Sequence, residues 1–249
     1  FDSGKEELKR VKKPDGEKKD PFVGSILDGR YEVEARLGEG GMGIVYRARH
    51  TFLNRPFAIK VLKSEVSKDA AILQRFRQEA QSATSIGSPH IIDISDFGVT
   101  KTGEAYFVME LLCGRPLAEV VAEGPMPIPL FLHVAKQLCD ALGAAHQHQI
   151  IHRDLKPDNI HLVRHGEDAN FIKVLDFGIA KVGGAASKLT QAGEIFGTPD
   201  YMSPEQCSGV AVDSRTDIYA LGILMYEMLT GRVPFTADDL VGVLSQHLY

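Results

Sequence analysis

The sequence predicts an α+β protein built from two lobes: a strand-rich first lobe with one helix, and a mainly helical second lobe. Short stretches typical of strands gather before residue 112, and longer stretches with helical periodicity dominate after it. The string Cys113-Gly114-Arg115-Pro116 separates the two parts. With 249 residues, of which 44% are hydrophobic and 24% charged, the chain can bury a sizeable core. We therefore divide it into a flexible charged leader (1–28), a first lobe (29–112) and a second lobe (113–249).

The leader is rich in lysine, arginine and acidic residues and poor in apolar ones. Such a stretch cannot bury enough apolar surface to offset the entropy lost on ordering. A tag or linker is the alternative interpretation.

The overall composition argues against several function classes. A net charge of −5 gives no reason to expect a nucleic-acid partner. The three cysteines, Cys113, Cys139 and Cys207, show no CxxC spacing, so we expect neither a disulfide framework nor a zinc site. A reducing cytoplasm fits this cysteine usage best. The longest apolar run, 218–229, is too short to cross a bilayer, so no membrane segment is expected within the chain, and an anchor outside it stays open.

The glycine-rich string 38–45 lies between predicted strands. Residues 31–37 alternate between apolar and polar, and the stretches 45–48 and 57–62 also resemble strands. A dinucleotide-binding glycine motif needs a helix directly afterwards, and a P-loop needs a GxxxxGK string followed by serine or threonine; neither is present. The remaining interpretations are a glycine-rich hairpin over a nucleotide and a plain turn.

Lys60 and Glu79 form a predicted pair. Lys60 shares a strand face with Ala58 and Leu62, and Glu79 falls inside the apolar stripe of a helix expected over 69–86. Each inward charge needs an opposite partner, because burying an unpaired charge is costly. Each side chain could instead be solvated, so the hypothesis depends on both together.

The second lobe is organised around a polar loop, His152-Arg153-Asp154-Leu155-Lys156-Pro157-Asp158-Asn159. Pro157 excludes a continuing helix and favours extended backbone at Lys156, so the polar groups are displayed on a stiff loop. Further strands are expected over 91–97, 105–112 and 171–175. Helices are expected around 130–145, just before the loop, and over 218–229; the latter is apolar nearly all round and should lie deep in the lobe. His146 and His148 fit a polar helix end better than a metal site.

At this point the chain strongly resembles the eukaryotic-like (Hanks-type) serine/threonine protein kinases, particularly their bacterial branch. The resemblance covers residues 31 to about 235. Five strings occur in the family's order and at compatible spacing: GEGGMGIV (38–45), FAIK (57–60), HRDLKPDN (152–159), DFG (176–178) and GTPDYMSPE (197–205).

The resemblance implies a two-lobed kinase fold, an antiparallel first-lobe sheet and transfer of the ATP γ-phosphate to serine or threonine hydroxyls of protein substrates. It implies that Asp154 accepts the hydroxyl proton, that Lys156 contacts the γ-phosphate, and that Lys60, fixed by Glu79, contacts the α- and β-phosphates. Asn159 and Asp176 would supply oxygen ligands to Mg²⁺, with Mn²⁺ as an alternative metal.

The resemblance also implies a nucleotide slot. Besides Lys60, Asn159 and Asp176, the cofactor-binding residues it implies are Leu37, Gly38, Glu39, Gly40, Gly41, Met42, Gly43, Val45, Ala58, Met109, Glu110 and Leu112. The loop's backbone N–H groups would cover the phosphates, Glu110 and Leu112 would meet the base edge through backbone groups, and Met109 would stand behind the base.

Regulation is implied by Arg153 beside Asp154. In this family such an arginine holds a phosphate on the segment that follows DFG. Thr190 is the first candidate for autophosphorylation and Ser187 the second, with a merely solvated threonine as the alternative. A homodimer would allow autophosphorylation in trans.

The departures from the family's pattern are few. Ser203 stands where the family more often has alanine, and Tyr219 where it more often has tryptophan. The family's last helices, and the arginine that usually pairs with the glutamate at Glu205, have no counterpart in this sequence. We therefore expect a second lobe that is truncated and partly exposed. A nucleotide-binding pseudokinase scaffold and a small-molecule phosphotransferase are the alternative functions.

Overall fold

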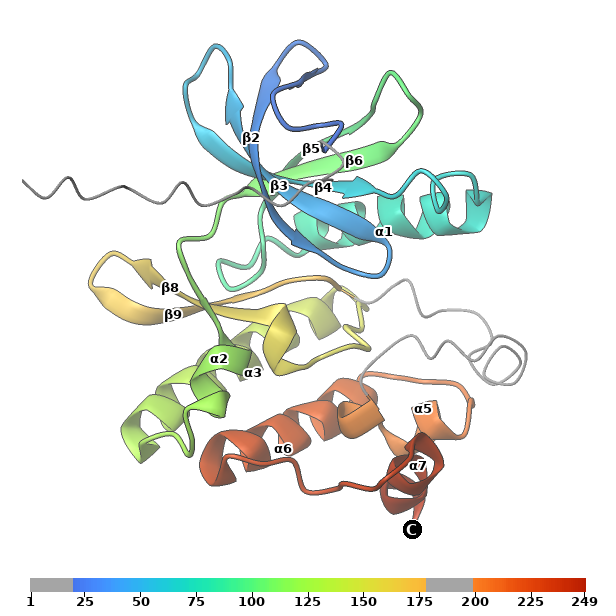
Figure 1. Ribbon diagram of the computed structural model, residues 1–249. Helices are drawn as coiled ribbons and strands as arrows, with labels where there is room; N and C mark the ends of the chain where they lie inside the picture. Colours follow the sequence, from blue (N-terminus) through green and yellow to red (C-terminus); the bar gives the residue numbers. More distant parts are fainter. Residues whose placement is uncertain (1–19, 178–198) are drawn as a thin grey trace, which may run out of the picture.

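The computed structural model describes residues 20–177 and 199–249, which form two lobes (Figure 1). The first lobe holds a six-stranded antiparallel sheet in the order β1-β2-β3-β4-β6-β5 and one helix, α1. Its elements are β1 (Ile26–Leu27), β2 (Tyr31–Glu39), β3 (Gly43–His50), β4 (Pro56–Leu62), α1 (Ala70–Ile86), β5 (Ile94–Val99) and β6 (Ala105–Glu110).

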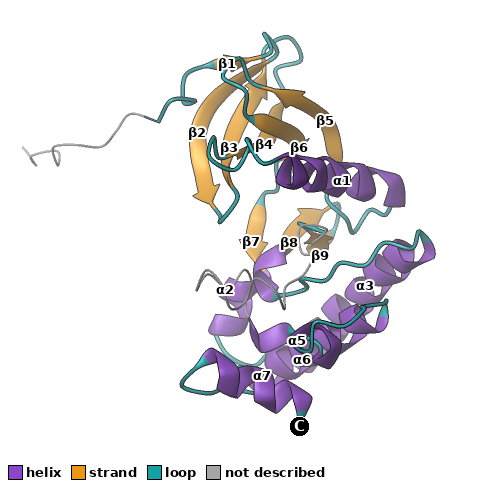
Figure 2. Cartoon of the chain, turned by 90° about the vertical axis from the view of Figure 1, so that its right-hand side faces the viewer, coloured by secondary structure: helices purple, strands orange, loops and turns teal. Residues whose placement is uncertain are grey.

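The second lobe is mainly helical and carries a three-stranded antiparallel sheet, β7-β8-β9, on the side that faces the first lobe (Figures 1 and 2). Its described elements are β7 (Gly114–Pro116), α2 (Leu117–Ala122), α3 (Ile128–Gln147), the 3₁₀ turn Pro157–Asn159, β8 (Ile160–His165), β9 (Asp168–Val174), the 3₁₀ turn Pro199–Tyr201, α5 (Pro204–Cys207), α6 (Arg215–Thr230) and α7 (Leu240–Leu248). The predicted α+β class and two-lobed arrangement are confirmed.

The predicted leader extends too far along the chain. Ile26 and Leu27 pair with β2, and the Phe22 ring packs edge-on against Tyr46 at a centroid distance of 5.7 Å. The Tyr46 hydroxyl also donates to the Asp20 carboxylate. Residues 20–28 therefore belong to the first lobe, because they cover apolar side chains on the outer face of its sheet.

The alternation expected along β2 holds only at its beginning. Tyr31 and Val33 are buried, whereas Leu37 is 52% exposed. Two register shifts, between Val33 and Ala35 and between Arg36 and Gly38, change which face the following side chains occupy. Leu37 consequently points away from the core.

Helix α1 begins where the sequence predicts. The Asp69 carboxylate caps its first turn by accepting from the backbone N–H of Ala71 and Ile72. Gly87 ends it in the left-handed region at φ 64°. The buried face of the helix contains Phe76, which stacks on Phe107 of β6, and so fixes the helix against the sheet.

Helix α6 is less deeply buried than its composition predicts. Leu224 and Met228 are fully buried, but Ile218 on another face is 56% exposed. Near its start, the Thr216 hydroxyl donates to Glu205 over 2.5 Å, so this carboxylate has a partner within the described residues even without the family's arginine. Among the described helices, none combines the length and apolar character needed to cross a membrane.

Candidate active site

Lys60 lies at the junction of the two lobes. Its Nζ is 3.0 Å from Oε1 of Glu79 in α1 and 2.7 Å from Oδ1 of Asp176, which follows β9. The Lys60 and Glu79 side chains are only 11% and 7% exposed. The expected Lys60–Glu79 pair is thus confirmed, and the contact with Asp176 extends it into the second lobe.

The electrostatics of these three side chains follow from one ammonium shared between two carboxylates. Burial would lower the pKa of Lys60, but the Asp176 and Glu79 carboxylates outweigh it and raise the pKa. Burial raises the pKa of Glu79 to about 7, a rise that Lys60 opposes and Asp176 reinforces. Burial would also raise the pKa of Asp176, but Lys60 outweighs it and lowers the pKa. Lys60 and Asp176 are therefore held charged.

The glycine-rich turn between β2 and β3 leaves space beside its backbone. A Cβ atom added to Gly38 or Gly41 would meet no heavy atom within 4 Å, and neither residue has positive φ. Gly43 differs, because a Cβ there would lie 2.6 Å from the Val61 carbonyl oxygen. Packing therefore requires Gly43, whereas Gly38 and Gly41 leave open a path by which a phosphate could approach the backbone.

The polar loop is anchored by Asp217 at the start of α6. This fully buried carboxylate accepts from the backbone N–H groups of His152 and Arg153, both over 2.8 Å, and lies 2.7 Å from Nε2 of His146. Arg153 adopts a left-handed backbone, φ 65°, which costs energy for a residue with a side chain. We infer that the bonds to Asp217 hold that conformation. His146 is thereby a structural helix-end residue, as its position predicted.

Asp154 and Asn159 face each other across the same loop. The Asn159 amide donates to the Asp154 backbone oxygen over 2.8 Å and lies 3.5 Å from its carboxylate. Because the amide nitrogen is used in this way, the amide oxygen is the atom that Asn159 can offer a metal. With Asp176, it gives the oxygen donors that Mg²⁺ prefers. Lys156 precedes the 3₁₀ turn in extended backbone, φ −159°, as the following proline predicts.

The strand β6 leads to the connection between the lobes. Met109 is buried, and the Glu110 side chain accepts from the Asp93 backbone N–H and from Lys173 Nζ of β9, the latter over 2.5 Å. Ala58 is buried on the sheet face that is continuous with the second-lobe core, and Val45 and Leu112 pack partly buried against the same cluster. The side chain of Glu110 therefore ties the connection to the second lobe.

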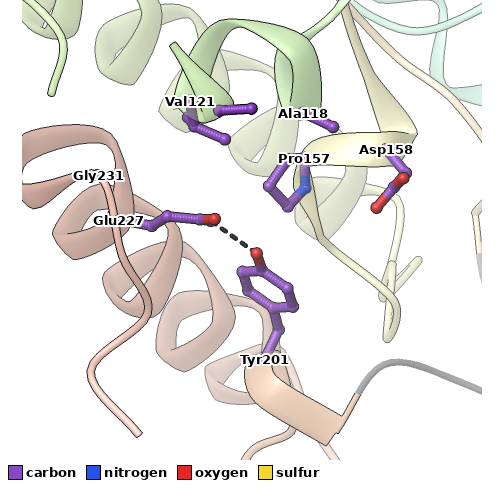
Figure 3. Close-up of a pocket in the computed structure, with 8 residues that line it drawn as sticks. Ala118, Val121, Pro157, Asp158, Tyr201, Glu227 and Gly231 are labelled. Carbon is purple, nitrogen blue, oxygen red and sulfur yellow. Dashed lines mark hydrogen bonds between the residues drawn. The ribbon is translucent and has the colours of Figure 1, made fainter. Parts of the chain in front are cut away.

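A cavity of about 230 Å³ lies beside the polar loop (Figure 3). Asp158 lines one side, and Tyr201 and Glu227 the other, with the Tyr201 hydroxyl donating to Glu227 over 2.6 Å. Burial raises the pKa of Glu227, while the Tyr201 hydrogen bond opposes the rise and the Asp200 and Asp158 charges add to it.

Sequence reasoning missed two residues that hold the polar loop in place. One is Asp217, and the other is Gln206, whose side-chain amide donates to the Arg153 backbone oxygen over 2.8 Å. A single carboxylate at the start of an apolar helix was the only available signal for Asp217. Gly178, the phosphosite candidates Ser187 and Thr190, and the Gly197-Thr198 pair lie outside the described residues.

The fold and site together define a two-lobed protein in which Lys60 of the first lobe is paired with Asp176 of the second, the lobe that also carries the polar loop with Asp154 and Asn159. This is the class of the protein kinase domains. The family model described as "Protein kinase domain" matches residues 31–247, so the chain belongs to that family.

Curated relatives agree with this assignment. The chain is 46% identical over 231 residues to serine/threonine-protein kinase Pkn1 of Myxococcus xanthus, covering 93% of this chain and 33% of the relative. It is 42% identical over 229 residues to serine/threonine-protein kinase PknB of Mycobacterium tuberculosis, covering 90% and 36%. The chain therefore spans about a third of the length of these relatives.

A solved structure of similar fold is the PknI kinase domain of Mycobacterium tuberculosis, crystallised as a point mutant. The TM-score is 0.67 and the identity 26%, with 91% of this chain and 90% of that chain covered.

Proposed function

We propose that this chain is the catalytic domain of a protein kinase that transfers the γ-phosphate of ATP to serine or threonine hydroxyls of protein substrates. The observation that carries the proposal is the Lys60 ammonium held between Glu79 and Asp176, because it joins the nucleotide-covering sheet to the lobe that bears Asp154. The serine/threonine names of the relatives support the acceptor class.

In this mechanism the chain supplies position and charge. Lys60 neutralises phosphate charge, and its carboxylate partners fix the ammonium in place. Asp154 accepts a hydrogen bond from the substrate hydroxyl, orients its oxygen and takes its proton as the new bond forms. Lys156, two residues further along the loop, stabilises negative charge on the transferred group. Asn159 and Asp176 would hold Mg²⁺, which when bound would supply Lewis-acid neutralisation of the phosphate charge.

The nucleotide slot is proposed on the same basis. The open space beside Gly38 and Gly41 supports phosphate binding under the glycine-rich turn. Ala58 and Val45 would cover the base from above, and backbone groups of Glu110 and Leu112 would meet its edge.

We also propose regulation by autophosphorylation of Thr190 or Ser187, in trans within a transient homodimer. The Arg153 guanidinium supports this, since its Nε is buried and has no hydrogen-bond partner among the described residues. Burial lowers the pKa of Arg153, a shift that Asp217 opposes. A phosphate would give this cation a partner. A cytoplasmic location is proposed from the free cysteines and the need for ATP.

Intact-mass measurement after incubation with ATP and Mg²⁺ tests the proposal. The unsubstituted chain should gain phosphate, Asp154→Asn should gain none, and Asp140→Asn, the same change on an exposed face of α3, should behave as the unsubstituted chain. Incorporation that survives Asp154→Asn would reject the assigned base. No incorporation by the unsubstituted chain, combined with intact ATP binding, would favour a pseudokinase scaffold.

A further inference from the structure

Glu39 places a negative charge on the glycine-rich turn between β2 and β3. It is the last residue of β2, and residues 40–42 then lead into β3. The turn is the part of the chain proposed to cover the phosphates of ATP. Because like charges repel, a carboxylate in this position would oppose triphosphate binding unless a cation compensated it.

Two cations meet this carboxylate. Lys63 Nζ lies 2.6 Å from Glu39 Oε1, and the Arg36 guanidinium donates to Glu39 Oε2. The Arg36 guanidinium is shared, since it also lies 4.0 Å from the Asp20 carboxylate. Lys63 is therefore the cation committed to Glu39 by the ion pairs of the described residues.

Lys63 also holds the turn through its backbone. It directly follows β4, the strand that carries Lys60, and its N–H donates to the Met42 carbonyl oxygen over 3.0 Å. One residue thus contacts the turn at both Glu39 and Met42. The backbone bond does not depend on the side chain, so it should keep the turn against β4 when the ammonium is replaced.

We propose that Lys63 is a positioning residue for ATP: its ammonium compensates the Glu39 charge, so that the glycine-rich turn can lie over the triphosphate. This inference rests on the proposed ATP-dependent function. Lys63 acts through Glu39 and needs no contact with the nucleotide. Its effect should therefore be confined to ligands that carry phosphates.

Calorimetric titration of the whole chain with ATP and Mg²⁺, and separately with adenosine, tests this inference without measuring activity. Lys63→Met should raise the Kd for ATP about three- to fivefold, equivalent to about 0.6–1 kcal/mol, as expected for a charge pair that is partly exposed. The Kd for adenosine should stay within about 1.5-fold, because adenosine carries no phosphate. Lys63→Arg keeps the charge and should bind ATP as the unsubstituted chain does.

Arg47→Met is the matched control for the loss of one positive charge from the first lobe. Arg47 lies further along β3, and its Nε is 2.8 Å from the Glu34 carboxylate of β2. This variant should leave the Kd for ATP within about 1.5-fold. Combining Lys63→Met with Glu39→Gln removes the carboxylate together with its cation, so the Kd for ATP should return to within the same range.

Glu39→Gln alone gives a test that needs no substitution at Lys63. If the pair only stabilised the fold, breaking it from either side would weaken ATP binding in the same direction. Charge compensation instead predicts opposite signs, because Glu39→Gln removes a repulsive charge and leaves the ammonium near the phosphates. The Kd for ATP should fall about two- to threefold in this variant.

The outcomes separate this inference from the proposed function. The inference would be overturned by an unchanged Kd for ATP in Lys63→Met, an equal rise for adenosine or in Arg47→Met, no recovery in the double variant, or a rise in Glu39→Gln. Each of these results would leave the proposed function intact. If the unsubstituted chain bound neither ATP nor adenosine, the inference and the proposed function would both fall.

Discussion

Replacing Lys60 by methionine removes the cation shared by Glu79 and Asp176 while keeping a side chain of similar length. In the native chain both carboxylates lie within 3.0 Å of the Lys60 Nζ atom. The Lys60→Met variant leaves two negative groups near each other at the lobe junction, with methionine unable to pair with either.

The expected loss of stability follows from burial. Removing one partner of a buried ion pair costs about 3–5 kcal/mol, because the other charge is left uncompensated. Glu79 is buried, but the Asp176 side chain is 45% exposed and can turn toward water. We therefore expect the lower end, about 3 kcal/mol, which corresponds to a decrease in Tm of roughly 6–12 °C for a chain of this size.

The dependence of this loss on pH gives a sharper test. Without Lys60, burial raises the pKa of Glu79, and repulsion between the two carboxylates raises the pKa values of both in the folded state above their unfolded values. Stability linked to a raised pKa is present below the unfolded pKa and is lost as pH rises through the folded pKa. The Tm difference between Lys60→Met and the native chain should therefore be larger at pH 8 than at pH 5.

Thermal unfolding followed by circular dichroism at both pH values measures this difference. Lys136→Met is the matched control, because Lys136 forms an exposed pair with Asp140 on α3 and its loss should leave Tm essentially unchanged. A loss below about 1 kcal/mol for Lys60→Met, or the same loss at pH 5 and pH 8, would refute the view that this ammonium compensates two carboxylates.

Three further predictions concern the second lobe. Asp217→Asn should destabilise the chain by about 2–4 kcal/mol, because an amide cannot accept as well from the loop's two backbone N–H groups; an unchanged denaturant midpoint would contradict this. Tyr201→Phe should cost about 1–2 kcal/mol by leaving the half-buried Glu227 carboxylate without its hydroxyl donor, and chemical unfolding that matches the native chain would disprove it. Burial lowers the pKa of His247 in α7, a shift that the Pro199 backbone and the Asp200 charge oppose. The neutral imidazole therefore stabilises the fold, and that stability is lost as pH falls below about 6.5. Between pH 7 and pH 5, the Tm of His247→Phe should decline less than that of the native chain, and parallel declines would rule out this linkage.

The sequence by itself determined which local segments form and which residues carry chemistry. Strand-like and helical patterns indicated the first-lobe strands from β2 to β6 and the helix containing Glu79, because such patterns reflect which face of an element is buried. The Asp69 cap and the extended backbone at Lys156 were also predictable, since each depends on neighbouring residues alone. The five ordered strings indicated the kinase family before any contact was known.

Only the tertiary structure decided how these segments meet. The register shifts that turn Leu37 outward, and the pairing that draws residues 20–28 into the sheet, depend on partner strands. The role of Asp217 depends on bonds formed between segments far apart in the chain. A local pattern records whether a side chain is buried, but not which distant group it meets, because that contact is set by packing of the whole chain.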